Sequence, residues 1–346
     1  MDLEALYHQV KEAIAGLDLA RIWPGFAPLK FALYDQERCF FDGKYIPKTE
    51  AFCANTSIWF QGEQIAIWMI AEETDVSVLA SKLVHEMFHG YQTVHGWDCW
   101  PNETEALFRY RYDAENLSRK LRENALLLEL LDHFDPALCR ELLSSRKLRC
   151  EKYPYEFSYE SKVEEIEGTA NYVEWQVLKQ LDPEKASALT ERMRAVMTSP
   201  EALFPIRISC YDTGALMINA LLQAGLYSFE PPARPAVLQV LKQIGLPDHR
   251  SPGGGAFLSE VTEAVRAFEQ SSREIIRAAL DRNEIVLRGP LPLTGLNIYD
   301  ARCCDGYLTS TYFLMYRAGE ENKLLEGNFV IRMKDETTID TVYRRS

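Results

Sequence analysis

The chain contains 346 residues, of which 47% are hydrophobic and 26% are charged, with a mean hydropathy of −0.23. This composition is typical of a soluble globular protein that is long enough to bury a large core and to form about two or three domains. The 38 Lys and Arg residues against 51 Asp and Glu residues give a net charge of −13. This charge argues against nucleic acid and against an anionic membrane surface as binding partners.

The N-terminal stretch 1–20 predicts an amphipathic helix rather than a signal peptide, because acidic residues come early and no apolar core with a cleavage site follows. No apolar run approaches the ~18–20 residues of a membrane span. The eight cysteines are scattered without a C-x-x-C motif, and the adjacent Cys303 and Cys304 are poorly placed for a mutual disulfide. We expect reduced thiols, mostly in the core of a cytoplasmic protein; a secreted enzyme made as a larger precursor is the alternative.

Short apolar runs separated by turn residues begin after Leu29 and predict β-strands. The expected strands are Lys30–Tyr34, Cys39–Ile46, Thr56–Phe60 and Gln64–Ile70. The last two runs flank Gln-Gly-Glu and predict a hairpin. We therefore expect a small antiparallel sheet immediately before the next helix.

The segment Asp75–His95 predicts a helix, because apolar residues recur in it at helical spacing. It contains His85-Glu86-Met87-Phe88-His89, an H-E-x-x-H motif. On a helix the two histidines lie one turn apart on one face, so both imidazoles can reach a single metal ion. Glu86 can then reach a water bound to that metal and act as a general base.

A third protein ligand is needed to complete such a site, and His95 is one candidate. The spacing of His85, His89 and His95 matches the metzincin pattern H-E-x-x-H-x-x-G-x-x-H. Gln92 stands where that pattern has its helix-breaking glycine. On an uninterrupted helix His95 points away from the other two histidines.

Glu167 is the second candidate, in a segment, Val163–Trp175, that predicts another helix. A polar stripe runs along this helix at steps of three and four: Glu164, Glu167, Asn171 and Glu174. A solvated acidic face is the alternative interpretation. Gly168 argues against it, because a glycine inside a good helix often marks the close approach of another element. Asn171, one turn beyond Glu167, can orient a ligand histidine.

The H-E-M-F-H motif followed by E-G-T-A on a second helix resembles the gluzincin zinc metallopeptidases, whose third ligand is a glutamate on a separate helix. The resemblance covers at most residues 58–175. It implies that His85, His89 and Glu167 bind zinc, that Glu86 is the catalytic base, and that Asn171 supports the site where many members have Asp.

Two further expectations follow from the resemblance. In gluzincins an edge strand binds substrate backbone by strand addition, so part of Ala54–Trp59 or Ile65–Met69 is expected to do so here; an ordinary structural hairpin is the alternative. Glu164 is the alternative ligand if the register of the second helix differs.

More helices are predicted from helical periodicity and from Asp-Pro start signals. They are Thr104–His133, Asp135–Cys150, Tyr153–Leu181, a helix restarting at Asp182-Pro183, Thr213–Leu226, Pro235–Gln243 and Leu258–Arg282. A peptidase of this kind needs a donor for the oxyanion that forms on the attacked carbonyl. Tyr211 is the first candidate, followed by Arg207, Tyr172 and His249.

The chain returns to strand patterns from Glu284 onward. The expected strands are Glu284–Leu287, Tyr307–Tyr316, Asn328–Met333 and Thr337–Val342, with turn signals at Gly289-Pro290, Asp305-Gly306 and Gly319. We expect a small β-rich C-terminal module over residues 284–346, after a zincin-like catalytic region over residues 1–283.

The sequence as a whole predicts an α+β zinc metallopeptidase with a mostly helical catalytic core, which hydrolyses peptides or proteins. Zinc is inferred from the ligand types, and Mn²⁺ or Co²⁺ can replace it. The competing hypotheses are a metzincin-like site that uses His95, a zinc hydrolase of a non-peptide amide or ester, and a non-catalytic metal-binding or regulatory protein.

Overall fold

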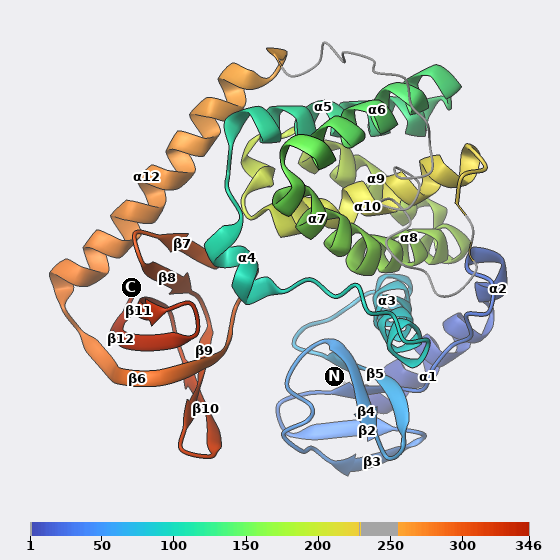
Figure 1. Ribbon diagram of the computed structural model, residues 1–346. Helices are drawn as coiled ribbons and strands as arrows, with labels where there is room; N and C mark the ends of the chain where they lie inside the picture. The colour runs from blue at the N-terminus through green and yellow to red at the C-terminus, as the bar shows by residue number, and fades with distance from the viewer. Residues whose placement is uncertain (1, 228, 230–254, 346) are drawn as a thin grey trace.

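The computed structural model describes residues 2–227, 229 and 255–345, which form the predicted α+β fold. A five-stranded sheet lies at the N-terminal end, helices occupy the middle of the chain, and a seven-stranded sheet ends it (Figure 1). The predicted helix Pro235–Gln243 lies outside the described residues. None of the helices in the described part of the chain combines the length and apolarity needed to cross a membrane.

The N-terminal sheet packs against α1 and has five strands where four were predicted, because the predicted strand Cys39–Ile46 turns at Asp42 and Gly43, which have φ angles of 50° and 80°. Its elements are α1 (Leu3–Ala15), α2 (Leu19–Ile22), β1 (Phe31–Tyr34), β2 (Arg38–Phe41), β3 (Lys44–Pro47), β4 (Thr56–Phe60) and β5 (Glu63–Met69). The strand order is β3-β2-β1-β5-β4, and β1 pairs with β5 in parallel. The sheet is therefore mixed, and the prediction of a fully antiparallel sheet was wrong. All four residues of β1 are buried, as in the parallel strands of covered sheets.

The helix α3 (Val76–Val94) lies against this sheet and carries the H-E-x-x-H motif. Its N-cap Asp75 accepts hydrogen bonds from the backbone N–H groups of Ser77 and Val78. A Cβ atom at Gly90 would lie 2.4 Å from Cδ1 of Leu29 and 2.9 Å from Cγ of Gln64 in β5, so a larger residue there would force these side chains to move. The helix thereby lies beside β4, the edge strand of the sheet.

The central helices begin mostly at aspartate or asparagine caps, several of them followed by proline. Their bounds are α4 Glu103–Arg109, α5 Ala114–Asp132, α6 Pro136–Lys152, α7 Pro154–Val163, α8 Thr169–Leu181, α9 Pro183–Thr198 and α10 Ile206–Gln223. A 3₁₀ turn, η2 (Glu201–Leu203), precedes α10.

Two predicted helices have other bounds in the structure. The single helix Thr104–His133 is divided into α4 and α5, because Tyr110 is extended and donates a hydrogen bond to buried Glu160. Asp113 then caps α5. The helix predicted to begin at Thr213 begins at residue 206, directly after Pro205.

The predicted second metal helix is one continuous helical run formed by α7, the π-helical turn η1 (Glu164–Gly168) and α8. Gly168 lies against Gly214 of α10, and a Cβ atom added at Gly168 would lie 2.5 Å from Cα of Gly214. The close approach predicted from Gly168 is thus confirmed. The contact fixes α10 against the turn that carries Glu167.

A cluster of charged side chains with no solvent exposure lies behind this turn. Its members are Lys120, Glu123, Arg146, Arg149, Glu160 and Glu164. Glu164 accepts a hydrogen bond of 2.9 Å from Lys120 Nζ and pairs with Arg146. Burial disfavours the ionised form of Glu164 and by itself would raise its pKa. The two cations outweigh this effect and lower the pKa of Glu164 to about 2. Glu164 is therefore the anchor of the turn.

The C-terminal sheet is antiparallel and packs against α12 (Leu258–Arg282), whose Ile276 and Ala279 contact its Val330 and Tyr343. Its strands are β6 (Ile285–Leu296), β7 (Arg302–Cys304), β8 (Tyr307–Ser310), β9 (Phe313–Ala318), β10 (Glu321–Glu326), β11 (Phe329–Asp335) and β12 (Thr338–Arg344). Their order is β10-β9-β6-β12-β11-β8-β7.

The strand predictions for this sheet were only partly right. β6 continues through Gly289-Pro290, where a turn was predicted. The glycine allows β6 to pass close to β12, because a Cβ atom at Gly289 would lie 2.0 Å from the Ile339 carbonyl oxygen. The predicted strand Tyr307–Tyr316 is two strands, separated at Tyr312, which has a φ of 66°. Neither β7 nor β10 was predicted.

Candidate metal centre

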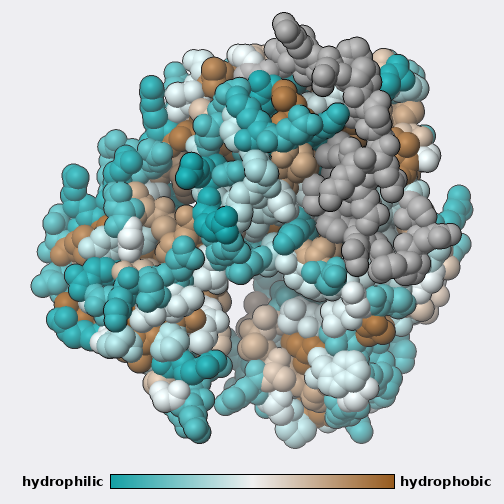
Figure 2. Space-filling model, viewed as in Figure 1, coloured by the Kyte–Doolittle hydropathy of each residue, from teal (hydrophilic) through white to brown (hydrophobic). Residues whose placement is uncertain are grey.

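A cleft of about 560 Å³ lies between the N-terminal sheet and helices α3, α8, α9 and α10. Residues 55–57 at the start of β4 form one wall, and Tyr299, in the C-terminal region, lies at another. In Figure 2 a notch separates the C-terminal sheet from the N-terminal sheet. The side chains of both histidines of the H-E-x-x-H motif, of Glu86 and of Glu167 line the cleft.

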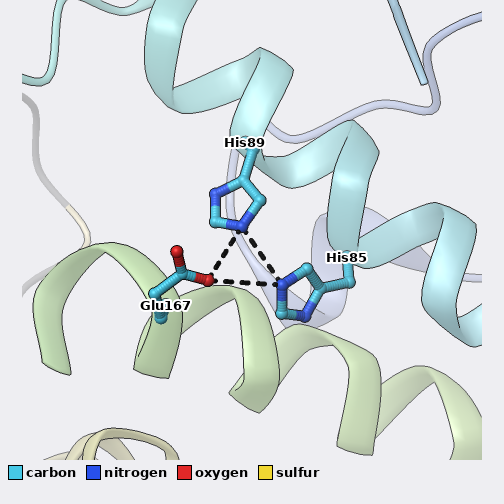
Figure 3. Close-up of side chains that lie close together, drawn as sticks. All are labelled: His85, His89 and Glu167. Atoms are coloured by element: carbon cyan, nitrogen blue, oxygen red, sulfur yellow. Dashed lines mark hydrogen bonds and ion pairs between the residues drawn. The ribbon is translucent and has the colours of Figure 1, made fainter. Parts of the chain in front are cut away.

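Three donor atoms of the predicted ligands converge in this cleft (Figure 3). Nε2 of His85 and Nε2 of His89 are 3.1 Å apart, and Oε2 of Glu167 lies 3.7 Å from the first and 3.2 Å from the second. Tetrahedral ligands at zinc bond lengths of about 2.05 Å are ~3.3 Å apart. The separations therefore fit a zinc ion held by these three residues.

The local structure explains the convergence. His85 and His89 are one turn apart on α3, so their rings extend from the same face of that helix (Figure 3). Glu167 extends toward them from the π turn on the facing helix. A π turn adds a residue to the helical turn, and such turns are frequent at functional sites.

Buried opposite charges hold the three ligands together. Burial disfavours the imidazolium of His85, but Glu167 and Glu174 outweigh burial and raise the pKa of His85 to about 10. Burial also disfavours the Glu167 carboxylate, but His89, His85 and Arg207 hold the pKa of Glu167 well below its usual value of 4.5. The site is therefore electrostatically suited to a cation that replaces the histidine protons.

Each ligand histidine has a second polar neighbour at its other ring nitrogen. Nδ1 of His85 lies 3.1 Å from Oε2 of Glu174, outside good hydrogen-bond alignment. Nδ1 of His89 lies 2.8 Å from Oε1 of Gln92, whose amide donates to the carbonyl of Ile166 at 2.9 Å. Such contacts fix the tautomer and orientation of ligand histidines.

Asn171 does not have the role that the sequence predicted. It lines the cleft, but its amide donates a hydrogen bond of 3.0 Å to Asp212 rather than to a ligand histidine. The polar neighbours of the Nδ1 atoms of His85 and His89 are Glu174 and Gln92 instead. Glu174 was visible in the polar stripe of α8, two helical steps beyond Glu167. The sequence placed Gln92 where the metzincin pattern has its glycine, and it did not predict the contact of Gln92 with His89.

Arg207 of α10 supports the glutamate ligand. Its guanidinium donates a hydrogen bond of 2.6 Å to Oε1 of Glu167, the oxygen that faces away from the histidines, and it also pairs with Glu103. Glu103 in turn accepts a hydrogen bond of 2.7 Å from the hydroxyl of Tyr159. Arg207, proposed from the sequence as an oxyanion donor, is thus occupied by two carboxylates.

The predicted base, Glu86, is half-buried in the cleft next to the first ligand. Burial is the largest effect on this carboxyl and raises the pKa of Glu86 above 4.5, against the opposing influence of His85 and His89. A carboxylate with a raised pKa is a better proton acceptor near neutral pH. Its environment therefore suits general-base chemistry.

Of the candidate oxyanion donors, Tyr211 is the one that lines the cleft. Its hydroxyl lies 3.2 Å from the hydroxyl of Tyr299, and burial raises the pKa of Tyr211, so the phenol stays protonated as a donor. Tyr172 is buried and is not part of the cleft lining. His249 lies outside the described residues.

The two alternative ligands are not brought to the site. His95 ends α3, and its Nδ1 lies 2.9 Å from the carbonyl oxygen of Tyr91, whose ring it stacks against. Glu164 is held in the buried charge cluster. A second group of potential ligands within the described residues, Glu160, Glu164 and Cys210, surrounds Lys120, whose ammonium lies 3.5 Å and 2.9 Å from the two carboxylates. Lys120 therefore already fills the place of a cation there.

Comparisons with known proteins do not extend these observations. No protein-family model matches the chain, and neither a similar curated protein nor a similar solved structure was found.

Proposed function

We propose that this chain is a zinc-dependent peptidase in which His85, His89 and Glu167 hold the metal. The observation that carries the proposal is the convergence of two imidazole nitrogens and one carboxylate oxygen at 3.1–3.7 Å, in a cleft that also contains Glu86. Three protein ligands with a fourth position open to the cleft are typical of catalytic zinc sites, whereas structural sites are closed by four.

Zinc bound at this site would supply a Lewis acid and lower the pKa of a bound water toward ~7. Glu86 accepts the proton of the attacking water and delivers it to the leaving amine. Tyr211 donates its phenolic hydrogen to the oxyanion that forms on the attacked carbonyl. Glu174 and Gln92 hold the rings of His85 and His89 in place.

A peptide is the substrate class that the shape of the cleft favours. β4 is an edge strand of the N-terminal sheet, and residues 55–57 line the cleft at its beginning. An edge strand offers unpaired backbone groups to which an extended peptide can add as a further strand. This arrangement favours a peptide bond over a small non-peptide amide or ester as the bond that is cut.

We also propose a reducing, cytoplasmic location. All eight cysteines lie in the described part of the chain and no disulfide joins any two of them, which is usual for proteins of that compartment.

The proposal is tested by the metal content of protein purified without added metal. We expect about one zinc per chain in the wild type, loss of zinc in Glu167→Ala, and retention in the matched control His95→Ala. Glu86→Gln should keep zinc and lose hydrolysis of a fluorogenic peptide library. Loss of zinc in His95→Ala alone would instead support the metzincin hypothesis. Unchanged peptidase activity in Glu86→Gln would refute the assigned chemistry.

A further inference from the structure

Two basic side chains, Lys82 and Arg192, line the cleft, and among the described residues neither has a carboxylate oxygen within the 4 Å of an ion pair. Neither forms a hydrogen bond or an ion pair within 4 Å with another residue that the structure describes. Arg207, which contacts the Glu167 ligand candidate from behind, is already engaged. It contacts two carboxylates at once. Unpaired cations inside a binding cleft are available to a ligand.

Lys82 lies one helical turn before Glu86 on the same face of α3, so it extends into the cleft beside the catalytic base. It is half-buried, and its ammonium lies 5.7 Å from the centre of the Trp68 ring. A cation above an aromatic face is attracted to the ring. Trp68 therefore attracts the ammonium without occupying its hydrogen-bond donors.

Arg192 reaches the cleft from α9, a different element, and is exposed to solvent. The helix α9 meets the beginning of α3, where Lys185 Nζ donates a hydrogen bond of 3.1 Å to Ser77 Oγ, so Lys82 and Arg192 line the same cleft from two helices that lie next to each other. Two carboxyl groups, Glu174 and Asp212, line this cleft as well. Glu174 is in contact with His85, and Asp212 accepts from Asn171. Neither acid forms an ion pair with the cations.

We propose that Lys82 and Arg192 form an anion subsite that binds a carboxylate of the peptide substrate on one side of the scissile bond. The inference rests on the proposed peptidase function and adds a substrate class to it. The fork of an arginine and the ammonium of a lysine together supply enough donors for both oxygens of a carboxylate. That carboxylate belongs either to an acidic side chain or to the C-terminus of the peptide.

Matched peptides test the subsite. One pair differs by Glu against Gln next to the cleaved bond, and a second pair differs by a free acid against an amide at the C-terminus. The wild type should cleave the carboxylate member of one pair with a kcat/KM about 10- to 100-fold higher, the range expected for hydrogen bonds to charged groups. The pair that shows the preference identifies the source of the carboxylate.

The variants Lys82→Met and Arg192→Gln should each remove most of that preference by lowering kcat/KM for the carboxylate peptide, while the neutral peptide is cleaved as before. Arg192→Lys, which keeps a charge, should retain part of it. Arg277→Gln removes a solvent-exposed arginine of α12 that does not line the cleft and should change nothing. Equal losses on both members of a pair, or a wild type without preference, would overturn the subsite.

Binding of the same peptides to zinc-loaded Glu86→Gln separates this inference from the function on which it rests. Fluorescence anisotropy should show tighter binding of the carboxylate peptide, and the difference should disappear in the Lys82→Met double variant. Selective binding without hydrolysis by the wild type would refute the peptidase proposal and keep the subsite. Hydrolysis without selective binding would refute the subsite alone.

Discussion

The contact between Gly168 and Gly214 gives a quantitative prediction, because it joins the helix of the glutamate ligand to α10. A Cβ atom added at Gly214 would lie 2.6 Å from the carbonyl oxygen of Glu164 and 2.7 Å from Cα of Gly168. Normal contacts of this kind are about 3.5 Å or longer. The atoms that would be struck belong to the backbone, so no side chain can rotate away. In Gly214→Ala the two helices must therefore separate by up to about 0.9 Å, the difference between 3.5 Å and the shorter contact of 2.6 Å.

The expected cost follows from two opposing effects. Overpacking in a core destabilises by about 1–3 kcal/mol, and a backbone clash belongs at the upper end of that range. Alanine is a better helix former than glycine by about 1 kcal/mol. We therefore expect Gly214→Ala to lower the free energy of unfolding by about 2 kcal/mol. Glu167 lies between the two residues that are struck, so zinc affinity should fall as well.

Chemical denaturation followed by circular dichroism measures the first effect, and competition with a chelator measures the second. Gly16→Ala is the matched control. Gly16 has a φ of −80°, and the nearest atom to an added Cβ would be 3.6 Å away, so alanine fits there. That variant should be slightly stabilised through its unfolded state and bind zinc normally. If Gly214→Ala were as stable as the wild type, the packing argument would be refuted.

Three further predictions follow from the site and the charge cluster. Gln92→Leu removes the neighbour of His89 Nδ1 and should weaken zinc binding about 10- to 100-fold in chelator competition. Zinc at 100 times its Kd should raise the free energy of unfolding by about 2.7 kcal/mol in calorimetry, and an equal gain in Glu167→Ala would contradict the site. The pKa of Glu164 falls from 4.5 to about 2 on folding, so this group contributes on the order of 3 kcal/mol above pH 4.5. That contribution is lost as the pH falls from 4.5 toward 2. In Glu164→Gln the free energy of unfolding should therefore decrease less steeply over this pH range than in the wild type, which denaturation at a series of pH values measures.

The convergence of His85, His89 and Glu167 was predictable because the position of each side chain depends on local order along a helix. His85 and His89 are four residues apart, and four residues bring side chains onto one helical face whatever the surroundings are. Glu167 was selected by the polar stripe and by the neighbouring Gly168. A glycine inside a helix marks a place where another element comes close, and this signal can be read from a single position. These signals survive in a single sequence because they do not depend on which helix packs against which.

The residues that support the ligands were harder to assign, because their roles depend on how two helices face each other. Asn171 and Glu174 both belong to the stripe of α8, and the periodicity alone does not tell which of them meets His85. The π turn before α8 shifts the stripe by one residue relative to a regular helix, and no local pattern in the sequence predicted that turn. Arg207 comes from α10, far along the chain, so its pairing with Glu167 had no local signal at all.

The strand errors have the same origin. β1 and β5 are separated by β2, β3 and β4, and their parallel pairing is decided by burial of β1 on both faces rather than by a turn. β10 has no buried residue and continues from β9 through a tight turn, so it lacks the apolar alternation by which strands are recognised. Edge strands of this kind are specified mainly by their neighbours.

The position of Glu167 therefore depends on interactions that lie well outside the metal site. Its turn is fixed from behind by Glu164, which pairs with two buried cations, and from the side by the Gly168 contact with α10. The same helix α10 places Arg207 on the far oxygen of Glu167. The carboxylate is thus positioned by three supports before any metal binds. A ligand held in this way loses little freedom on coordination, which favours tight and selective metal binding.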